Sequence, residues 1–168
     1  MAMLERTKRV LRPVLRPVIA AGIAVGVLWL AFNLVNNLVN LDAVGVSELD
    51  AIHLALLVAL LGVAGFWGAW QTGRARMGAL AGGFAALLGA AIGIVTLFII
   101  TFLFIDTIRQ NTFMIEDFQR SGMQSMDAFI VADALGRAFF GGILSLLLGA
   151  TLGAIGGLIG VWVRRLRS

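Results

Sequence analysis

Four long apolar runs constrain the fold of this chain more than any other feature of its sequence. They cover residues 18–40, 51–70, 78–105 and 136–163. A helix needs about 20 apolar residues to cross the hydrocarbon core of a bilayer, where it satisfies its backbone hydrogen bonds internally. Only 13% of the residues are charged, too few to cover a soluble globule. We therefore predict an all-α polytopic membrane protein, a four-transmembrane-helix bundle that forms a single domain over residues 1–168.

Basic and acidic residues fall on opposite sides of these runs. Most of the basic residues lie in the arm 1–17, between the second and third runs, or after the fourth run: Arg6, Lys8, Arg9, Arg12, Arg16, Arg74, Arg76, Arg164, Arg165 and Arg167. Acidic residues dominate the other two connections. By the positive-inside rule, we expect both termini to be cytoplasmic, with the protein in the cell (inner) membrane. Because short flanking blocks explain the net charge of +4, we expect the lipid bilayer and no nucleic acid as a partner.

The first run is expected to be an uncleaved anchor, because no small-residue cleavage signal follows it. The repeated tetrapeptide LRPVLRPV precedes the run and contains Pro13 and Pro17. Proline removes a helical hydrogen bond and is best tolerated in the first turn of a helix. We therefore expect Pro17 to lie in the first turn of the first span, with residues 1–17 as a basic cytoplasmic arm.

The connection 106–135 mixes acidic residues with large apolar ones, so we predict an amphipathic segment on the outer face between the third and fourth spans. Ser121-Gly122 should interrupt it. Ser121 and Gln124 have the spacing of a capping box, which predicts a helix start at Ser121. Further along, the pair Gly141-Gly142 is the best candidate for a kink in the fourth span.

Glycine repeats mark the faces on which the helices are expected to pack. The fourth span contains GATLGAIGGLIG, and similar spacing occurs in the first and third spans; the predicted packing residues are Gly149, Gly153, Gly156, Gly157, Gly160, Gly22, Gly26, Gly78, Gly82, Gly89 and Gly93. Glycine at every fourth position makes a groove in which another helix backbone approaches closely. This pattern resembles a glycine zipper, a packing motif and not a family. Either these faces pack on one another within one bundle, or at least one of them contacts another subunit.

Polar side chains gather in the outer half of the predicted bundle. The cluster comprises Asn33, Asn36, Asn37, Asn40, His53, Asp133 and Arg137. Asp133 and Arg137 are spaced to pair across one helical turn. The asparagines are interpreted first as hydrogen-bond donors between helices. The alternative is a site for a polar headgroup, a quinone or a pigment.

His53 is the one histidine of the chain. A neutral imidazole can ligate haem iron or the magnesium of a chlorin when its second nitrogen is held by an amide. The ordinary interpretation of a single histidine near a span end, an interfacial side chain, is favoured over this axial ligand. No other metal site is predicted. Lipid is the ligand that the sequence favours, and quinone, haem and chlorin remain open.

Catalytic signatures are missing from the sequence. There is no cysteine, HExxH motif, Ser/His/Asp spacing or phosphate-binding loop, so we expect no enzyme activity. Ionisable groups are also lacking between the predicted membrane interfaces. The favoured hypothesis is a non-catalytic accessory subunit of a larger membrane assembly, respiratory or photosynthetic, whose partners are other membrane subunits or copies of itself. The alternative is a homo-oligomeric small transporter or channel.

Overall fold

Residues 2–167 fold into six helices. The computed structural model describes the backbone of residues 2–167 and the side chains of residues 15–42 and 44–167. The helices are α1 (Ala2–Leu38), α2 (Ala43–Thr72), α3 (Ala75–Leu103), α4 (Ile105–Ile108), α5 (Thr112–Ser121) and α6 (Met126–Arg165), with no strand among residues 2–167. The prediction of an all-α protein is therefore confirmed for this part of the chain.

Four of these helices are long and apolar enough to cross a membrane. The apolar stretches are Leu15–Leu38, Val44–Thr72, Ala75–Leu103 and Met126–Arg165. Large apolar side chains are exposed along all four helices, among them Val27, Val63, Leu103 and Phe140. Such an exterior is suited to contact with lipid tails. The arrangement is that of a multi-pass membrane protein, as expected.

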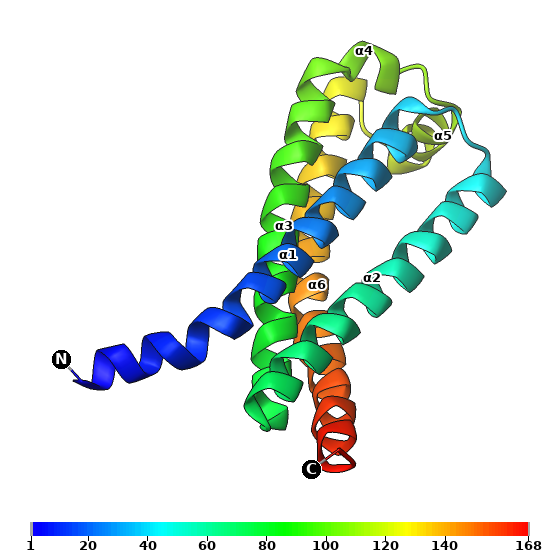
Figure 1. Ribbon diagram of the computed structural model, residues 1–168. Coiled ribbons are helices and arrows are strands. Elements are labelled where there is room, and N and C mark those ends of the chain that lie inside the picture. Colours follow the sequence, from blue (N-terminus) through cyan, green and yellow to red (C-terminus); the bar gives the residue numbers. More distant parts are fainter. Residues whose placement is uncertain (1, 168) are drawn as a thin grey trace.

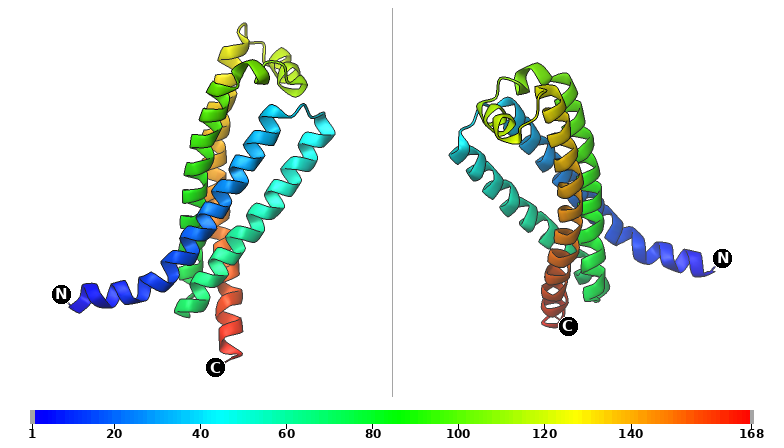
Figure 2. Two further views of the ribbon diagram at one scale, coloured as in Figure 1. Left: turned by 45° about the horizontal axis from the view of Figure 1, so that its top comes forward. Right: turned by 180° about the vertical axis from the view of Figure 1, so that it is seen from behind.

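The long helices form a bundle in which α3 and α6 lie side by side (Figure 1). α1 packs mainly on α3, and α2 packs mainly on α6. α2 diverges from α6 toward the end of the bundle that carries α4 and α5, here called the α5 end (Figure 1). The beginning of α1 and the end of α6 both lie toward the opposite end (Figures 1 and 2).

α1 continues through both prolines, which corrects the expectation that a helix begins near Pro17. It runs without interruption from Ala2 to Leu38. Each proline removes only one backbone donor, and the neighbouring turns keep their own hydrogen bonds. The helix changes direction near this segment, so that its first turns project away from the bundle (Figure 2).

The first connection between long helices is shorter than the expected loop at 41–50. α2 begins at Ala43, because Asp42 is its N-cap and the Asp42 Oδ1 atom accepts a hydrogen bond of 2.8 Å from the Gly45 amide. This contact satisfies one of the free amides of the first turn. Residues 43–50, expected in a loop, therefore extend the second long helix.

The segment 106–135 contains α4, α5 and the first turns of α6. α5 ends at Ser121, and Gly122 adopts a left-handed conformation with φ 69°, so the expected interruption at Ser121-Gly122 is correct. The predicted capping box is wrong. Ser125 caps α6 instead, through a hydrogen bond of 3.3 Å from the Ala128 amide to the Ser125 Oγ atom. Ser121 Oγ accepts from the amide of Met123, within the turn between the two helices.

Small side chains fill much of the space between the long helices. The main core contains Ala81, Ala85 and Ala86 of α3 together with Val25 and Leu61. A second, smaller cluster of Ile108, Met114 and Ile130 joins α4, α5 and α6 at the α5 end. The short helices are thus packed onto the bundle and cover its end.

Candidate functional site: a cavity at the α5 end

Each glycine predicted to mark a packing face lies against another helix of the same chain. On α6, a Cβ atom added at Gly153 would come within 2.6 Å of the Gly78 carbonyl oxygen of α3. One added at Gly160 would come within 2.5 Å of the Phe66 carbonyl oxygen of α2. A Cβ atom added at any of the other predicted glycines would also come within 3.0 Å of an atom of another helix: Gly22, Gly26, Gly78, Gly82, Gly89, Gly93, Gly149, Gly156 and Gly157. These faces are therefore occupied within the chain.

Two of the predicted asparagines form hydrogen bonds inside the bundle. Asn33 and Asn37 are buried. The Asn33 Nδ2 atom donates to the Gly93 carbonyl oxygen of α3 at 3.1 Å, and Asn37 Nδ2 donates to the Asn33 carbonyl oxygen at 2.8 Å. Thr96 Oγ1 donates to the same Gly93 oxygen at 3.0 Å. The side chain of Asn33 therefore joins α1 to α3.

The other two asparagines have different surroundings. Asn40 lies beyond the end of α1, and its Oδ1 atom accepts a hydrogen bond of 3.0 Å from the Thr112 amide at the start of α5. Asn36 lines a cavity. The four asparagines of the predicted polar cluster are thus divided between helix packing, attachment of α5 and the wall of a cavity.

His53 lies in an aromatic environment. Its ring stacks on Phe32 with a centroid distance of 4.3 Å and an interplanar angle of 20°, and it meets Trp29 edge-on at 4.6 Å. The buried Nε2 atom has no hydrogen-bond partner among the described residues. His53 is not one of the residues that line the cavity. The two ring contacts place His53 within the aromatic packing between α1 and α2.

Asp133 and Arg137 form the predicted ion pair. The Arg137 Nε atom lies 2.8 Å from Asp133 Oδ2, and both side chains are about three-quarters buried, with exposed fractions of 29% and 27%. Partial burial makes such a charge-assisted contact stronger than an exposed one. The pair fixes the arginine at the α5 end of α6.

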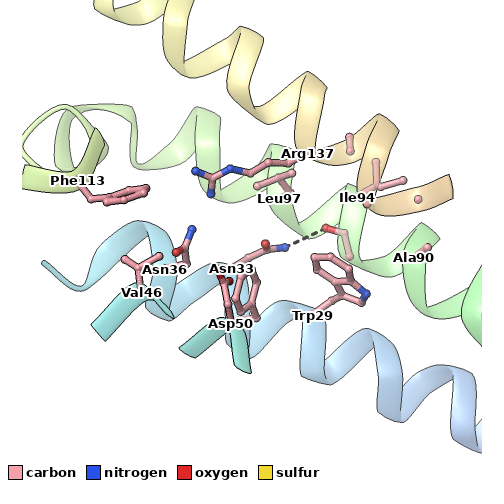
Figure 3. Close-up of a pocket in the computed structure, with 15 residues that line it drawn as sticks. Trp29, Asn33, Asn36, Val46, Asp50, Ala90, Ile94, Leu97, Phe113 and Arg137 are labelled. Atoms are coloured by element: carbon pink, nitrogen blue, oxygen red, sulfur yellow. Dashed lines mark hydrogen bonds between the residues drawn. The ribbon is translucent and has the colours of Figure 1, made fainter. Parts of the chain in front are cut away.

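A cavity of about 350 Å³ lies next to this ion pair. Its lining comes from five helices: Trp29, Phe32, Asn33 and Asn36 of α1, Val46 and Asp50 of α2, Ala90, Gly93, Ile94 and Leu97 of α3, Phe113 of α5, and Arg137, Ala138, Gly141 and Gly142 of α6. Figure 3 shows the Arg137 guanidinium reaching over Asn33 and Asn36, with Phe113 beyond it. The walls are largely apolar, and the polar groups gather toward the α5 end.

Sequence reasoning missed several residues of this site. Trp29 lies one helical turn before Asn33 on the same face of α1, so the helical spacing from Asn33 could have identified it. Gly141 and Gly142, which the sequence marked as the candidate kink, also belong to the cavity wall. Phe113 had no signal beyond its place in an amphipathic segment, because only the folding back of α5 brings it to the cavity.

Arg109 organises the short helices outside the cavity. It donates from Nε to Asp127 Oδ1 at 2.6 Å and from Nη1 to Asp106 Oδ1 at 2.9 Å, which joins α4 to the start of α6. The hydrogen bond to Asp127 raises the pKa of Arg109, so the guanidinium stays charged. These contacts hold α4 against the start of α6.

The described residues contain no group of three or more histidine, cysteine, aspartate or glutamate side chains arranged to hold a metal ion. Comparison of the chain with models of protein families, with curated proteins and with solved structures gave no match. The cavity is therefore the candidate functional site of the protein.

Proposed function

We propose that the protein is a non-catalytic subunit of a larger membrane assembly and that it holds a small amphipathic molecule in the cavity at its α5 end. The observation that carries this proposal is the cavity itself, with its volume of about 350 Å³. Ligand pockets have volumes of roughly 300–1,000 Å³, with apolar walls and a few polar groups that fix the ligand. The α5-end cavity has these properties.

The proposed orientation places the termini in the cytoplasm and the α5 end outside the cell membrane. The support is the distribution of charge, because Arg74, Arg76 and Arg164 lie at the end opposite α4 and α5. Arg164 Nη1 also donates to the carbonyl oxygens of Trp70 and Gln71 at the end of α2. Basic residues favour the cytoplasmic side of an inner membrane.

Membership of an assembly is supported by the first turns of α1. These turns project away from the bundle (Figure 2), and their sequence contains Arg6, Lys8, Arg9 and Arg12. The glycine faces contribute less to this argument than the sequence suggested, because they are occupied within the chain. A neighbouring subunit is therefore proposed to contact the projecting part of α1.

Purification from native membranes in a mild detergent tests the assembly. Different polypeptides should co-migrate with the protein and form photo-cross-links to a reactive amino acid placed at Val10. A ladder of identical chains, with cross-links only between copies, would instead support a homo-oligomeric transporter or channel.

Solvent extraction of the purified protein tests the bound molecule. Wild type should release a small molecule that is lost from the Gly142→Leu variant, because a leucine there extends into the cavity while its Cβ atom meets Ile94 Cδ1 at an ordinary 3.5 Å. Gly136→Leu is the matched control on α6, since a Cβ atom at Gly136 has nothing within 4 Å. Identical extracts from wild type and both folded variants would refute the binding role.

A further inference from the structure

The wall of the cavity formed by α6 is nearly flat. Ala138, Gly141 and Gly142 contribute no side-chain atom beyond Cβ, and Ala90 and Gly93 of α3 continue this surface. A Cβ atom added at Gly141 would lie 3.5 Å from Trp29 Cη2, so the indole of α1 reaches across to α6. A surface of small residues beside aromatic rings accommodates a flat ring, because Ala138, Gly141 and Gly142 project little into the cavity.

The polar end of the cavity presents hydrogen-bond donors that the protein does not use. The ion pair with Asp133 engages the Nε atom of Arg137. Figure 3 shows the terminal nitrogen atoms of Arg137 directed over Asn33 and Asn36. No hydrogen bond joins those terminal atoms or the Asn36 amide to the described part of the chain. A carbonyl or hydroxyl oxygen placed there would accept from both side chains.

Charge at this end favours a neutral headgroup over an anionic one. Arg137 is the one basic side chain among the described residues that line the cavity, and Asp133 already neutralises it. Asp50 adds a carboxylate to the lining. A carboxylate or phosphate headgroup would therefore meet an unpaired carboxylate and an arginine whose charge is already balanced. Unfavourable charge of this kind excludes competing ligands.

An apolar groove adjoins the cavity and provides space for a tail. The groove lies between α3 and α6, has a volume of about 530 Å³, and is lined only by apolar residues of the described chain, including Leu87, Phe98, Phe139 and Leu146. It shares Ala90, Ile94, Ala138 and Gly142 with the cavity. The cavity and the groove therefore meet at these mostly small residues, and an apolar tail is proposed to pass between them to the lipid-facing side of the bundle.

We propose that the molecule held in the cavity is a lipid-soluble quinone, with its ring beside Trp29 on the small-residue wall of α6, one ring oxygen at Arg137 and Asn36, and its tail in the α3–α6 groove. This inference rests on the proposed binding function and specifies its ligand. The ring is flat and neutral, it carries acceptor oxygens at its edge, and its tail is apolar. The cavity fits the flat shape, the neutral charge and the acceptor oxygens of the ring, and the groove fits the apolar tail.

Fluorescence of Trp29 provides the test. In a background with Trp67, Trp70 and Trp162 replaced by phenylalanine, Trp29 reports directly on the cavity. A benzoquinone with a decyl chain should quench it saturably. A decyl-dimethylbenzene, in which methyl groups replace the two ring oxygens, and decanoate, which has an anionic head, are measured by their displacement of the quinone, because they do not themselves quench tryptophan strongly. Each should bind more weakly by about tenfold, the factor expected for losing a hydrogen bond to a charged donor.

Two variants isolate the polar end of the site. Asn36→Leu and the double variant Asp133→Leu/Arg137→Leu, which removes both charges together, should each weaken quinone binding about tenfold. The matched control is the double variant Glu116→Leu/Arg120→Leu, which removes an exposed ion pair of α5 and should bind as wild type does. Far-UV circular dichroism checks that each variant is folded.

The outcomes separate the ligand class from the binding function. If the oxygen-free analogue or decanoate binds as tightly as the quinone and Gly142→Leu abolishes that binding, the quinone assignment is overturned while the cavity remains a binding site. If no compound binds saturably to wild type, both proposals fail. Saturable quinone binding that is weakened by the variants of the polar end and by Gly142→Leu, but not by the control variants, supports both.

Discussion

At the scale of single residues, neighbouring glycines of this chain meet very different surroundings. A Cβ atom at Gly82 would come within 2.7 Å of the Gly153 Cα atom, whereas one at Gly83 has nothing within 4 Å. Both glycines are in α3, so replacing either of them by alanine changes the intrinsic helix propensity by the same amount. Only the approach of α6 distinguishes them, because a backbone atom cannot move aside as a side chain can.

Gly82→Ala is therefore expected to destabilise the protein by about 1–3 kcal/mol, the usual cost of overpacking. Gly83→Ala should be neutral or slightly stabilising, because alanine is the better helix former. Thermal unfolding of both variants in detergent, followed by circular dichroism, measures the difference. Equal melting temperatures would contradict the close approach of α3 and α6.

The asparagines provide a second comparison between residues. Asn33→Leu removes the hydrogen bond to the Gly93 carbonyl of α3 and should cost about 0.6–2 kcal/mol. Asn36→Leu should leave stability nearly unchanged, since the Asn36 side chain lines the cavity and makes no hydrogen bond with the described residues. Chemical unfolding of the two variants checks this order. A larger loss for Asn36→Leu would show that Asn36, too, holds the helices together.

At the scale of elements, α5 is attached to the bundle by a few polar contacts and one apolar cluster. Asn111 Oδ1 caps α5 by accepting from the Phe113 amide at 3.0 Å, and its Nδ2 donates to the Val39 carbonyl beyond α1 at 3.2 Å. The same residue therefore starts the helix and holds it over the cavity. Met114 packs in the apolar cluster beneath it.

These two roles of Asn111 can be separated. Asn111→Asp keeps an oxygen to cap α5 but loses the donor to Val39, whereas Asn111→Ala loses both contacts. We expect faster amide exchange throughout α5 in Asn111→Ala, at a cost of about 1–2 kcal/mol for a lost cap and hydrogen bond. In Asn111→Asp, faster exchange should be confined to the contact with residues 39–40. Hydrogen exchange measured by mass spectrometry distinguishes the two variants. Gln119→Ala, at an exposed position of α5, is the control. Unchanged exchange in Asn111→Ala would argue against this attachment.

At the scale of the whole molecule, charge separates the two ends of the bundle. Asp106, Glu116 and Asp117 lie at the α5 end, and Arg74, Arg76 and Arg164 lie at the other. This asymmetry is what would orient the protein during insertion, because basic residues are retained on the cytoplasmic side.

The absence of cysteine from the sequence makes the orientation straightforward to test. A membrane-impermeant maleimide should label the Gln119→Cys variant in intact cells and the Arg76→Cys variant only after permeabilisation. Both positions are exposed, so packing does not limit the reaction. The reverse labelling pattern would invert the proposed topology, and labelling of both variants in intact cells would argue against a single orientation.

The sequence by itself determined the class of fold, because apolar runs of this length have few alternatives in lipid. It also identified the Asp133–Arg137 pair and the end of α5 at Gly122, since both depend on residues close together in the chain. It placed helix starts less well: α2 begins at Ala43 through its Asp42 cap, and α1 continues through Pro13 and Pro17.

Only the tertiary structure decided what the glycines and asparagines contact. Helical spacing shows which residues share a face, but not which helix that face meets. The Gly153 face lies against α3, Asn33 reaches α3, and Asn36 is left at a cavity. The cavity arises because five helices contribute to it and because α5 folds back over the bundle, long-range relations that no local pattern encodes.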